Sequence, residues 1–304
     1  MTMRRQPFRL RRALLLAAVA AAVAVTGPPV AAQERPAARQ GSEAAAEDWV
    51  SFAAGGNHTC GIRASGRLYC WGQDSYGQIG GGGANTNRAA PAEVAGGRTD
   101  WASVTAGGSH TCARTTANRL FCWGSGLYGQ LGDNQIGSER SAPAEVYGGR
   151  ADWVSVTAGY HHTCARTTGH RLYCWGGDAS GQIGNGGTNT NKPTPRQVAG
   201  SRTDWVSVAA GGNHTCARTA ARSVYCWGYD AYGQVGDSGA NTNQAAPVHV
   251  AGSVTEWIAV TAGGNHACGQ VPTGRLYCWG YDYFGQVGDG GANTNRAAPA
   301  EVVA

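Results

Sequence analysis

The chain contains 304 residues, of which 42% are hydrophobic and 14% charged, and it includes 48 glycines and 10 tryptophans. This composition favours a turn-rich β protein over a helical one, and the length is ample for a sizeable core. Five of the 24 basic residues and none of the 19 acidic ones lie in the first 32 positions, so the rest of the chain is formally neutral. A neutral chain with the single lysine Lys192 lacks the basic surface that binding to nucleic acid or to an anionic membrane requires.

The N-terminal segment has the layout of a secretory signal peptide. Arginines within positions 4–12 precede an apolar run at 13–25, and prolines and small residues follow. The apolar run is too short to cross a bilayer. We therefore predict a signal peptide over residues 1–32 with cleavage after Ala32, and a short disordered linker over residues 33–48. The mature protein is expected to be secreted, to the extracellular space or the periplasm.

A 52-residue period organises the rest of the chain. Tryptophan recurs at this spacing, at Trp49, Trp101, Trp153, Trp205 and Trp257. The period defines one domain over residues 49–304 with five repeats, at 49–100, 101–152, 153–204, 205–256 and 257–304. Self-similarity at such a period is typical of propellers and solenoids.

Each repeat contains four short strand patterns. In the third repeat they lie at residues 153–157, around Cys164, at residues 173–176 and at residues 195–198. Four strands per repeat predict an all-β fold, a β-propeller of five four-stranded blades. Because a blade packs both faces against its neighbours, we expect the tryptophans to lie between blades. The repeated Ala-Gly-Gly should lie where backbones crowd near the central axis.

Paired cysteines recur at a spacing of ten in every repeat. In the first repeat, Cys60 and Cys70 flank a predicted hairpin turn at residues 64–66, with Gly66 where a left-handed backbone is needed. Opposed positions of such a hairpin lie within disulfide reach, and export favours oxidation. We predict five disulfides within repeats, at Cys60–Cys70, Cys112–Cys122, Cys164–Cys174, Cys216–Cys226 and Cys268–Cys278. A zinc site of His58, Cys60 and Cys70 would have only three ligands and no CxxC knuckle.

The repeats argue against catalysis. An enzyme needs one asymmetric cluster of acid, base or nucleophile, whereas near-identical repeats offer five equivalent sites or none. One histidine-rich break in the symmetry, at His161, His162 and His170, is interpreted as accidental. The repeated histidines are His58, His110, His162, His214 and His266. We expect them to donate hydrogen bonds to buried backbone, and we predict no catalytic residue, no metal and no cofactor.

Two loop elements remain candidate ligand sites. The first is the aromatic residue before Gly-Gln, found at Tyr76, Tyr128, Tyr232 and Phe284 and replaced by Ser180 in the third repeat. The second is the Gly/Asn-rich turn, such as residues 289–295, which offers fewer carboxylates than calcium cages use. Turn formation through bonds from side chain to backbone is the favoured interpretation of this second element.

The repeats share one multi-part motif, with single substitutions. It reads Ala-Gly-Gly-x-His-Thr-Cys, then Gly-Arg-Leu-Tyr-Cys-Trp-Gly, then Tyr-Gly-Gln-Ile/Val-Gly and Pro-x-x-Val, over residues 49–304. This motif resembles the repeat of the regulator of chromosome condensation family. The resemblance implies a β-propeller in which strands from both chain ends usually complete one blade. Its best-known members have seven blades, and its nuclear members lack paired cysteines, so five repeats with cysteine pairs are similar to an exported bacterial branch.

The resemblance leaves the function open, because family members include nucleotide exchange factors, light and ubiquitin-pathway modules and secreted inhibitors of β-lactamases. Our first hypothesis is a secreted, non-catalytic propeller that binds an extracellular or cell-envelope protein in an inhibitor-like way. The second is a multivalent glycan-binding protein, resembling five-bladed lectins such as tachylectin, with one site per blade. Unlike loops would favour the first and repeated loops the second. In the sequence the loops mostly repeat, a pattern that a recent duplication also produces without any ligand. A whole number of repeats predicts a closed, monomeric five-bladed ring, with an incomplete or oligomer-completed ring as the alternative.

Overall fold

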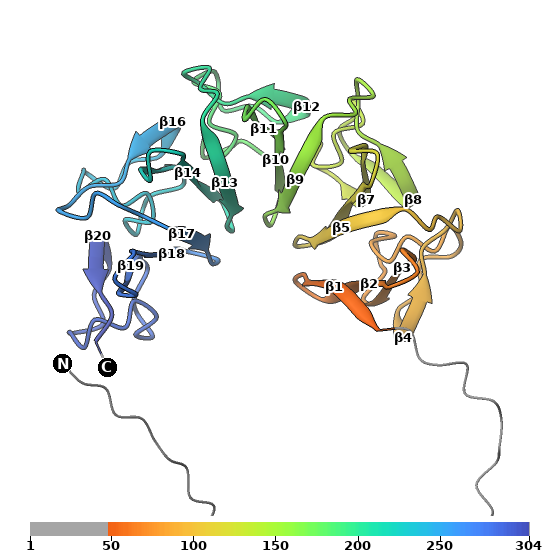
Figure 1. The fold of residues 1–304 in the computed structure, drawn as a ribbon, viewed down its shortest axis with the longest axis horizontal. Coiled ribbons are helices and arrows are strands. Elements are labelled where there is room, and N and C mark those ends of the chain that lie inside the picture. The colour runs from red at the N-terminus through yellow and green to blue at the C-terminus, as the bar shows by residue number, and fades with distance from the viewer. Residues whose placement is uncertain (1–47, 304) are drawn as a thin grey trace, which may run out of the picture. The chain divides into compact units, whose positions relative to one another are not determined.

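The computed structural model describes residues 48–303, which form twenty strands and no helix (Figure 1). The strands pair into five antiparallel sheets, each made of four strands that are consecutive in the chain. The predicted all-β fold with five four-stranded blades is confirmed. Each blade is complete within one repeat, so the shared blade that the family resemblance implied does not occur in residues 48–303. The predicted signal peptide and all but the last residue of the predicted linker lie outside the described residues.

The strands of the five blades are as follows, in chain order. The first blade contains β1 (Trp49–Ala54), β2 (His58–Arg63), β3 (Leu68–Gly72) and β4 (Arg88–Glu93). The second contains β5 (Trp101–Ala106), β6 (His110–Thr115), β7 (Leu120–Gly126) and β8 (Ser138–Glu145). The third contains β9 (Trp153–Ala158), β10 (His162–Thr167), β11 (Leu172–Gly176) and β12 (Lys192–Gln197). The fourth contains β13 (Trp205–Ala210), β14 (His214–Thr219), β15 (Val224–Gly228) and β16 (Gln244–His249). The fifth contains β17 (Ala259–Ala262), β18 (His266–Gln270), β19 (Leu276–Gly280) and β20 (Arg296–Glu301).

The predicted hairpin is present in each blade. Cys60 of β2 lies opposite Cys70 of β3 with 4.0 Å between their Cα atoms, and a disulfide joins them. The turn reverses through Gly66, whose φ of 76° is left-handed. The other blades carry the same cross-link, at Cys112–Cys122, Cys164–Cys174, Cys216–Cys226 and Cys268–Cys278. The two central strands of every blade are therefore tied together within their own repeat.

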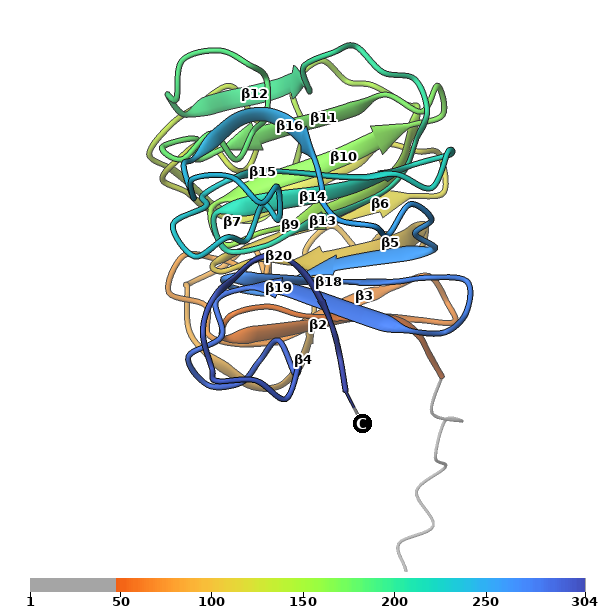
Figure 2. The same cartoon turned by 90° about the vertical axis from the view of Figure 1, so that its left-hand side faces the viewer.

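Tryptophans fill the space between neighbouring blades. Trp101, the first residue of the second blade, is buried in one cluster with Ile62, Leu68 and Ile79 of the first blade. Trp153, Trp205 and Trp257 enter the corresponding clusters on the second, third and fourth blades. Buried indoles contribute large apolar contact areas, so the blades depend on one another for stability. The sheets stack face to face around the arc, as the fourth and fifth blades show in Figure 2.

A hydrogen-bond network also crosses each interface between blades. His58 Nε2 lies 2.8 Å from Thr111 Oγ1, and the Thr111 hydroxyl donates to the Gln78 carbonyl at 2.8 Å. Trp123 Nε1 donates to the same Gln78 carbonyl at 3.0 Å. His110 and His162 repeat the first contact with Thr163 and Thr215. The predicted backbone partner is therefore wrong for His58, His110 and His162, because each of these histidines bonds to a threonine hydroxyl of the next blade.

The blades form an open arc, and the predicted closure of the ring is wrong in this structure. Within residues 48–303, no histidine–threonine or tryptophan–glutamine bond joins the fifth blade to the first (Figure 1). Trp49 is 38% exposed and Leu276 is 42% exposed, whereas the equivalent Trp153 and Leu172 are both 1% exposed. All four interfaces bury the tryptophan that opens the next blade, and three of them share the histidine–threonine bond. Five blades joined in this way leave the ring incomplete, which is the alternative expected above.

Candidate functional site

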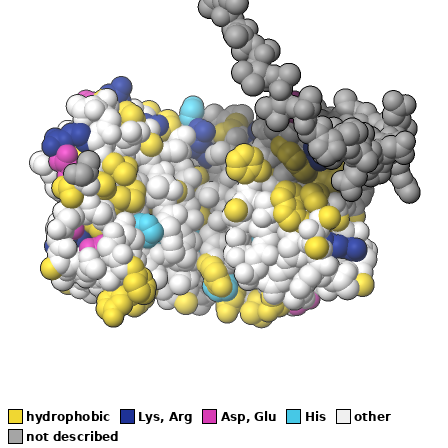
Figure 3. Space-filling view, turned by 90° about the horizontal axis from the view of Figure 1, so that it is seen from below, with side chains coloured by type: hydrophobic (Ala, Val, Ile, Leu, Met, Phe, Trp, Pro, Cys, Tyr) yellow, Lys and Arg dark blue, Asp and Glu magenta, His cyan; other side chains and the backbone are white. Residues whose placement is uncertain are grey.

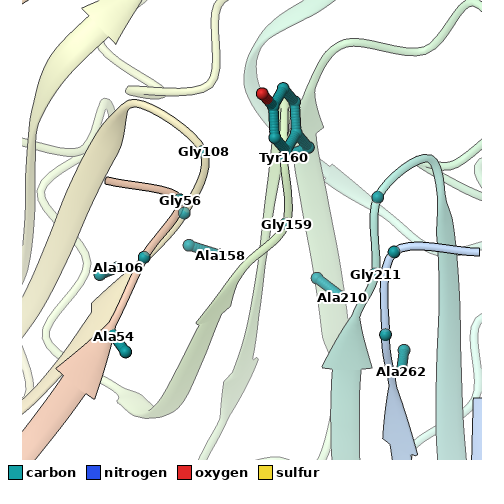
Figure 4. A pocket seen from close by; sticks show the side chains of 15 residues that line it. Ala54, Gly56, Ala106, Gly108, Ala158, Gly159, Tyr160, Ala210, Gly211 and Ala262 are labelled. Carbon is teal, nitrogen blue, oxygen red and sulfur yellow. The ribbon is translucent and has the colours of Figure 1, made fainter. Parts of the chain in front are cut away.

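The Ala-Gly-Gly segments of the five repeats lie around the axis of the arc. They line a shallow cavity of about 180 Å³, in which Tyr160 stands in place of a glycine (Figure 4). Neighbouring segments touch through their backbones, since the Gly108 amide donates to the Gly159 carbonyl at 3.2 Å. The expected crowding near the axis is confirmed. The residues that line the cavity are alanines, glycines and Tyr160, whose phenol is the one titratable side chain among them.

The loops that follow the third strand of each blade are held rigid by their own side chains. In the first blade, Tyr76 donates its amide to Gln78 Oε1 at 2.9 Å, and the Ile79 amide donates to Asp74 Oδ1 at 2.9 Å. Asn87 Oδ1 of the Gly/Asn-rich turn accepts the Asp74 amide at 3.0 Å. The same asparagine contact recurs at Asn191, Asn243 and Asn295. The turn-forming role expected of these asparagines is confirmed.

Five aromatic side chains of the fourth and fifth blades gather on these loops. We call them the aromatic cluster: Tyr229, Tyr232, Tyr281, Tyr283 and Phe284. The ring centroids of Tyr232 and Tyr281 lie 4.8 Å apart, which joins the two blades, and those of Tyr283 and Phe284 lie 5.0 Å apart. Tyr283 is 65% exposed and Phe284 is 78% exposed. The cluster therefore presents a continuous aromatic surface to solvent.

The structure does not bring the four candidate aromatics together. Tyr232 and Phe284 share the aromatic cluster, each contacting Tyr281. Tyr128 instead packs on His161, with 4.5 Å between ring centroids, and Tyr76 is 40% exposed in the first blade. The five loops are thus unlike one another in their surroundings, although their backbones repeat.

Burial shifts several pKa values near the interfaces and loops. It lowers the pKa of His110 and His162 to about 3, and it raises the pKa of Asp230 to about 6. Asp230 Oδ1 accepts the Val235 amide at 2.8 Å, which fixes the loop that carries Tyr232. The histidines are therefore neutral structural groups at pH 7. Residues 48–303 contain no group of three or more His, Cys, Asp or Glu side chains that could hold a metal ion.

A family model described as the RCC1-like domain matches residues 24–303. This chain belongs to the RCC1-like domain family. The ultraviolet-B receptor UVR8 of Arabidopsis thaliana is 29% identical to it over 276 residues, which are 89% of this chain and 62% of the receptor. The E3 ubiquitin-protein ligase HERC2 of Homo sapiens is 29% identical over 248 residues, 80% of this chain and 5% of the ligase. The chain thus spans less than two thirds of the length of these relatives.

Solved structures share the fold of this RCC1-like chain. Human WBSCR16 superposes with a TM-score of 0.75 at 22% identity, covering 85% of this chain and 68% of its own. Prp20p of Saccharomyces cerevisiae gives a TM-score of 0.74 at 21% identity, covering 85% of this chain and 64% of its own. The described part of the RCC1-like chain has no helix that is both long and apolar enough to span a membrane.

Sequence reasoning missed three members of the aromatic cluster in this RCC1-like domain. Tyr229, Tyr281 and Tyr283 were not among the candidate residues, because the candidates were aromatic residues at a position that most repeats share. The signal lies in what the repeats do not share. The position of Tyr283 holds Ser75, Leu127, Ala179 and Ala231 in the other repeats. A comparison of unlike positions would therefore have pointed to the fourth and fifth blades.

Proposed function

We propose that this RCC1-like protein is an exported, non-catalytic propeller that binds an extracellular or cell-envelope protein through its aromatic cluster. The observation that carries the proposal is the exposed, asymmetric grouping of Tyr232, Tyr281, Tyr283 and Phe284 on two neighbouring blades. Exposed tyrosine and phenylalanine side chains supply large contact areas at small entropic cost and are enriched at protein interfaces. A relative of the same fold, Prp20p, has been studied for its binding to Gsp1p and histones.

The unlike loops support one protein partner over five sugar sites. A lectin with one site per blade requires equivalent contacts, but Ser180 stands in the third repeat where Tyr232 and Phe284 stand in the fourth and fifth. Tyr128 packs on His161 instead of on another loop tyrosine, and Tyr76 lies 40% exposed in the first blade. A protein partner needs no such equivalence, since a single patch suffices for one contact.

The cysteines support export. Five disulfides occur in residues 48–303, and no cysteine in that part of the chain is free. Disulfides in this number persist in oxidising compartments and are rare in the cytosol. An inhibitor-like role fits a rigid, cross-linked scaffold, because a pre-organised surface loses little entropy on binding.

A pull-down with the mature protein from cell-envelope and culture fractions tests the proposal, alongside a glycan array. We expect one stoichiometric protein partner, whose affinity falls at least tenfold in the double variant Tyr283→Ala, Phe284→Ala. The matched control is Tyr147→Ala, which removes a 58% exposed tyrosine outside the cluster and should leave binding unchanged. Saturable sugar binding near five per chain, or capture that both variants leave intact, would overturn the proposal.

A further inference from the structure

The outer face of the fifth blade carries an open groove of about 250 Å³. Residues of β17, β18 and β19 line it, namely Ala259, Val260, Thr261, Cys268, Gly269, Gln270 and Leu276. Figure 3 views the molecule from the side of the gap and shows hydrophobic side chains on that side of the arc. The groove lies on the sheet face and is separate from the aromatic cluster, which lies on the loops.

In each of the remaining four blades, the equivalent face is covered by the next blade. Leu68, Leu120, Leu172 and Val224 occupy the position of Leu276, and they are 0% or 1% exposed, against 42% for Leu276. In each of these blades a tryptophan that begins the next blade joins the same buried cluster. The fifth blade therefore keeps an indole-binding face without the indole.

A backbone acceptor marks where the missing tryptophan would begin. The amide of Trp101 donates to the Gly66 carbonyl in the turn of the first blade, and Trp257 donates likewise to the Arg222 carbonyl. The corresponding carbonyl in the fifth blade is that of Gly274, which accepts the Gln270 side-chain amide at 3.3 Å. A carbonyl has two lone pairs, so it retains capacity for a second donor.

We infer that this groove binds an extended segment of a separate protein that presents a tryptophan, with the tryptophan amide donating to Gly274 and the indole packing on Leu276 and Cys268. The segment would make the same contacts as the first strand of each blade makes on the preceding blade, as residues 152–158 do on the second blade. This inference concerns a second surface and does not rest on the aromatic cluster.

The first blade, from the same chain or from a second copy, fits the groove less well than a segment of a separate protein. The Arg63 guanidinium already covers the Trp49 ring, 3.7 Å from its centroid. Phe52 stands where the other repeats have valine, and it is 79% exposed. The first blade thus departs from the pattern that fills the other four faces.

A fluorescein-labelled peptide with the sequence of residues 152–158 provides the probe, read by anisotropy with the mature protein. We expect saturable binding that falls at least tenfold when the peptide carries Trp153→Ala, and equally when the protein carries Leu276→Asp. Leu127→Asp is the matched control, since Leu127 is 56% exposed and lies away from the groove. Because Leu276 is exposed, its substitution leaves the interior interfaces intact.

Three results would overturn the inference. One is no binding up to about 1 mM peptide, the limit of weak specific affinity. Another is binding that Leu276→Asp leaves unchanged. The third is self-association of the wild-type protein that both Leu276→Asp and Phe52→Asp abolish in light scattering, which would assign the groove to the first blade. None of these results bears on the Tyr283 and Phe284 variants, so the inference and the proposed function fail separately.

Discussion

Ala267→Thr should strengthen the interface between the fourth and fifth blades. The other interfaces contain a buried threonine at this position, and its hydroxyl links a histidine of the preceding blade to a glutamine carbonyl. Ala267 breaks the pattern. As a consequence, His214 Nε2 lacks the threonine partner that the other interfaces provide, while the Gln234 carbonyl still accepts the indole N–H of Trp279.

The size of the effect follows from the bonds restored. A net intramolecular hydrogen bond contributes about 0.5–1.5 kcal/mol, and an unsatisfied buried polar atom costs about 1–3 kcal/mol. Thr111, Thr163 and Thr215 all fit their sites at 0% exposure, so the equivalent site should accept the added hydroxyl and methyl. We expect a gain of about 1–2 kcal/mol and a rise in melting temperature of about 2–4 °C per kcal/mol.

Thermal unfolding and hydrogen exchange of the fifth blade measure this gain. The matched control is Thr215→Ala, which removes the same contact between the third and fourth blades and should cost about 1–3 kcal/mol. The reasoning is refuted if Ala267→Thr is neutral or destabilising while Thr215→Ala costs what is expected. That pair of results would mean that the last interface differs in shape as well as in its bonds.

Acid should destabilise the protein, because unfolding returns His110 and His162 from a pKa of about 3 to about 6.5. The unfolded chain then binds protons that the folded chain does not, so stability falls by about 1.4 kcal/mol per pH unit per histidine as the pH drops below about 6.5. Asp230, with a pKa raised to about 6, opposes this trend but is outnumbered by the buried histidines. Urea titrations from pH 7 to pH 4 measure the trend, and a flat or rising stability would contradict it. Gly159→Ala should destabilise the protein by about 1–3 kcal/mol, because the new Cβ would lie 2.5 Å from the Gly211 carbonyl oxygen. Thermal unfolding measures this loss. The control is Gly81→Ala, whose Cβ would meet nothing within 4 Å and which should be near neutral. Mass mapping of non-reduced peptides should find every disulfide within its own repeat, and reduction should lower stability by about 2–3 kcal/mol per bond; cross-repeat pairs would contradict the hairpin register.

Local features of this RCC1-like fold were predictable, because they depend on short spacings. The distance from Cys60 to Cys70 and the glycine at position 66 together define the hairpin and its disulfide. The partner of His58 was not predictable in the same way, since Thr111 lies one repeat further along the chain. Sequence spacing gives the number of blades but carries no information on the angle between them, which is why ring closure was predicted wrongly.

The candidate site was predictable only in part. The position before Gly-Gln pointed to Tyr232 and Phe284, which are two of the five members of the aromatic cluster. Their joining through Tyr281 depends on how the fourth and fifth blades pack, which no single repeat encodes. The open groove near Leu276 likewise lies where the neighbouring blade is missing, which the fifth repeat alone does not reveal.

We propose that one asymmetric aromatic surface binds one protein. Hydrogen exchange on the mature protein, with and without the captured partner, tests this claim most directly. We predict protection concentrated in residues 229–236 and 281–288, the loops that carry the aromatic cluster, with the loops of the first three blades unchanged. Equal protection of all five loops, or protection confined to other surfaces, would contradict it.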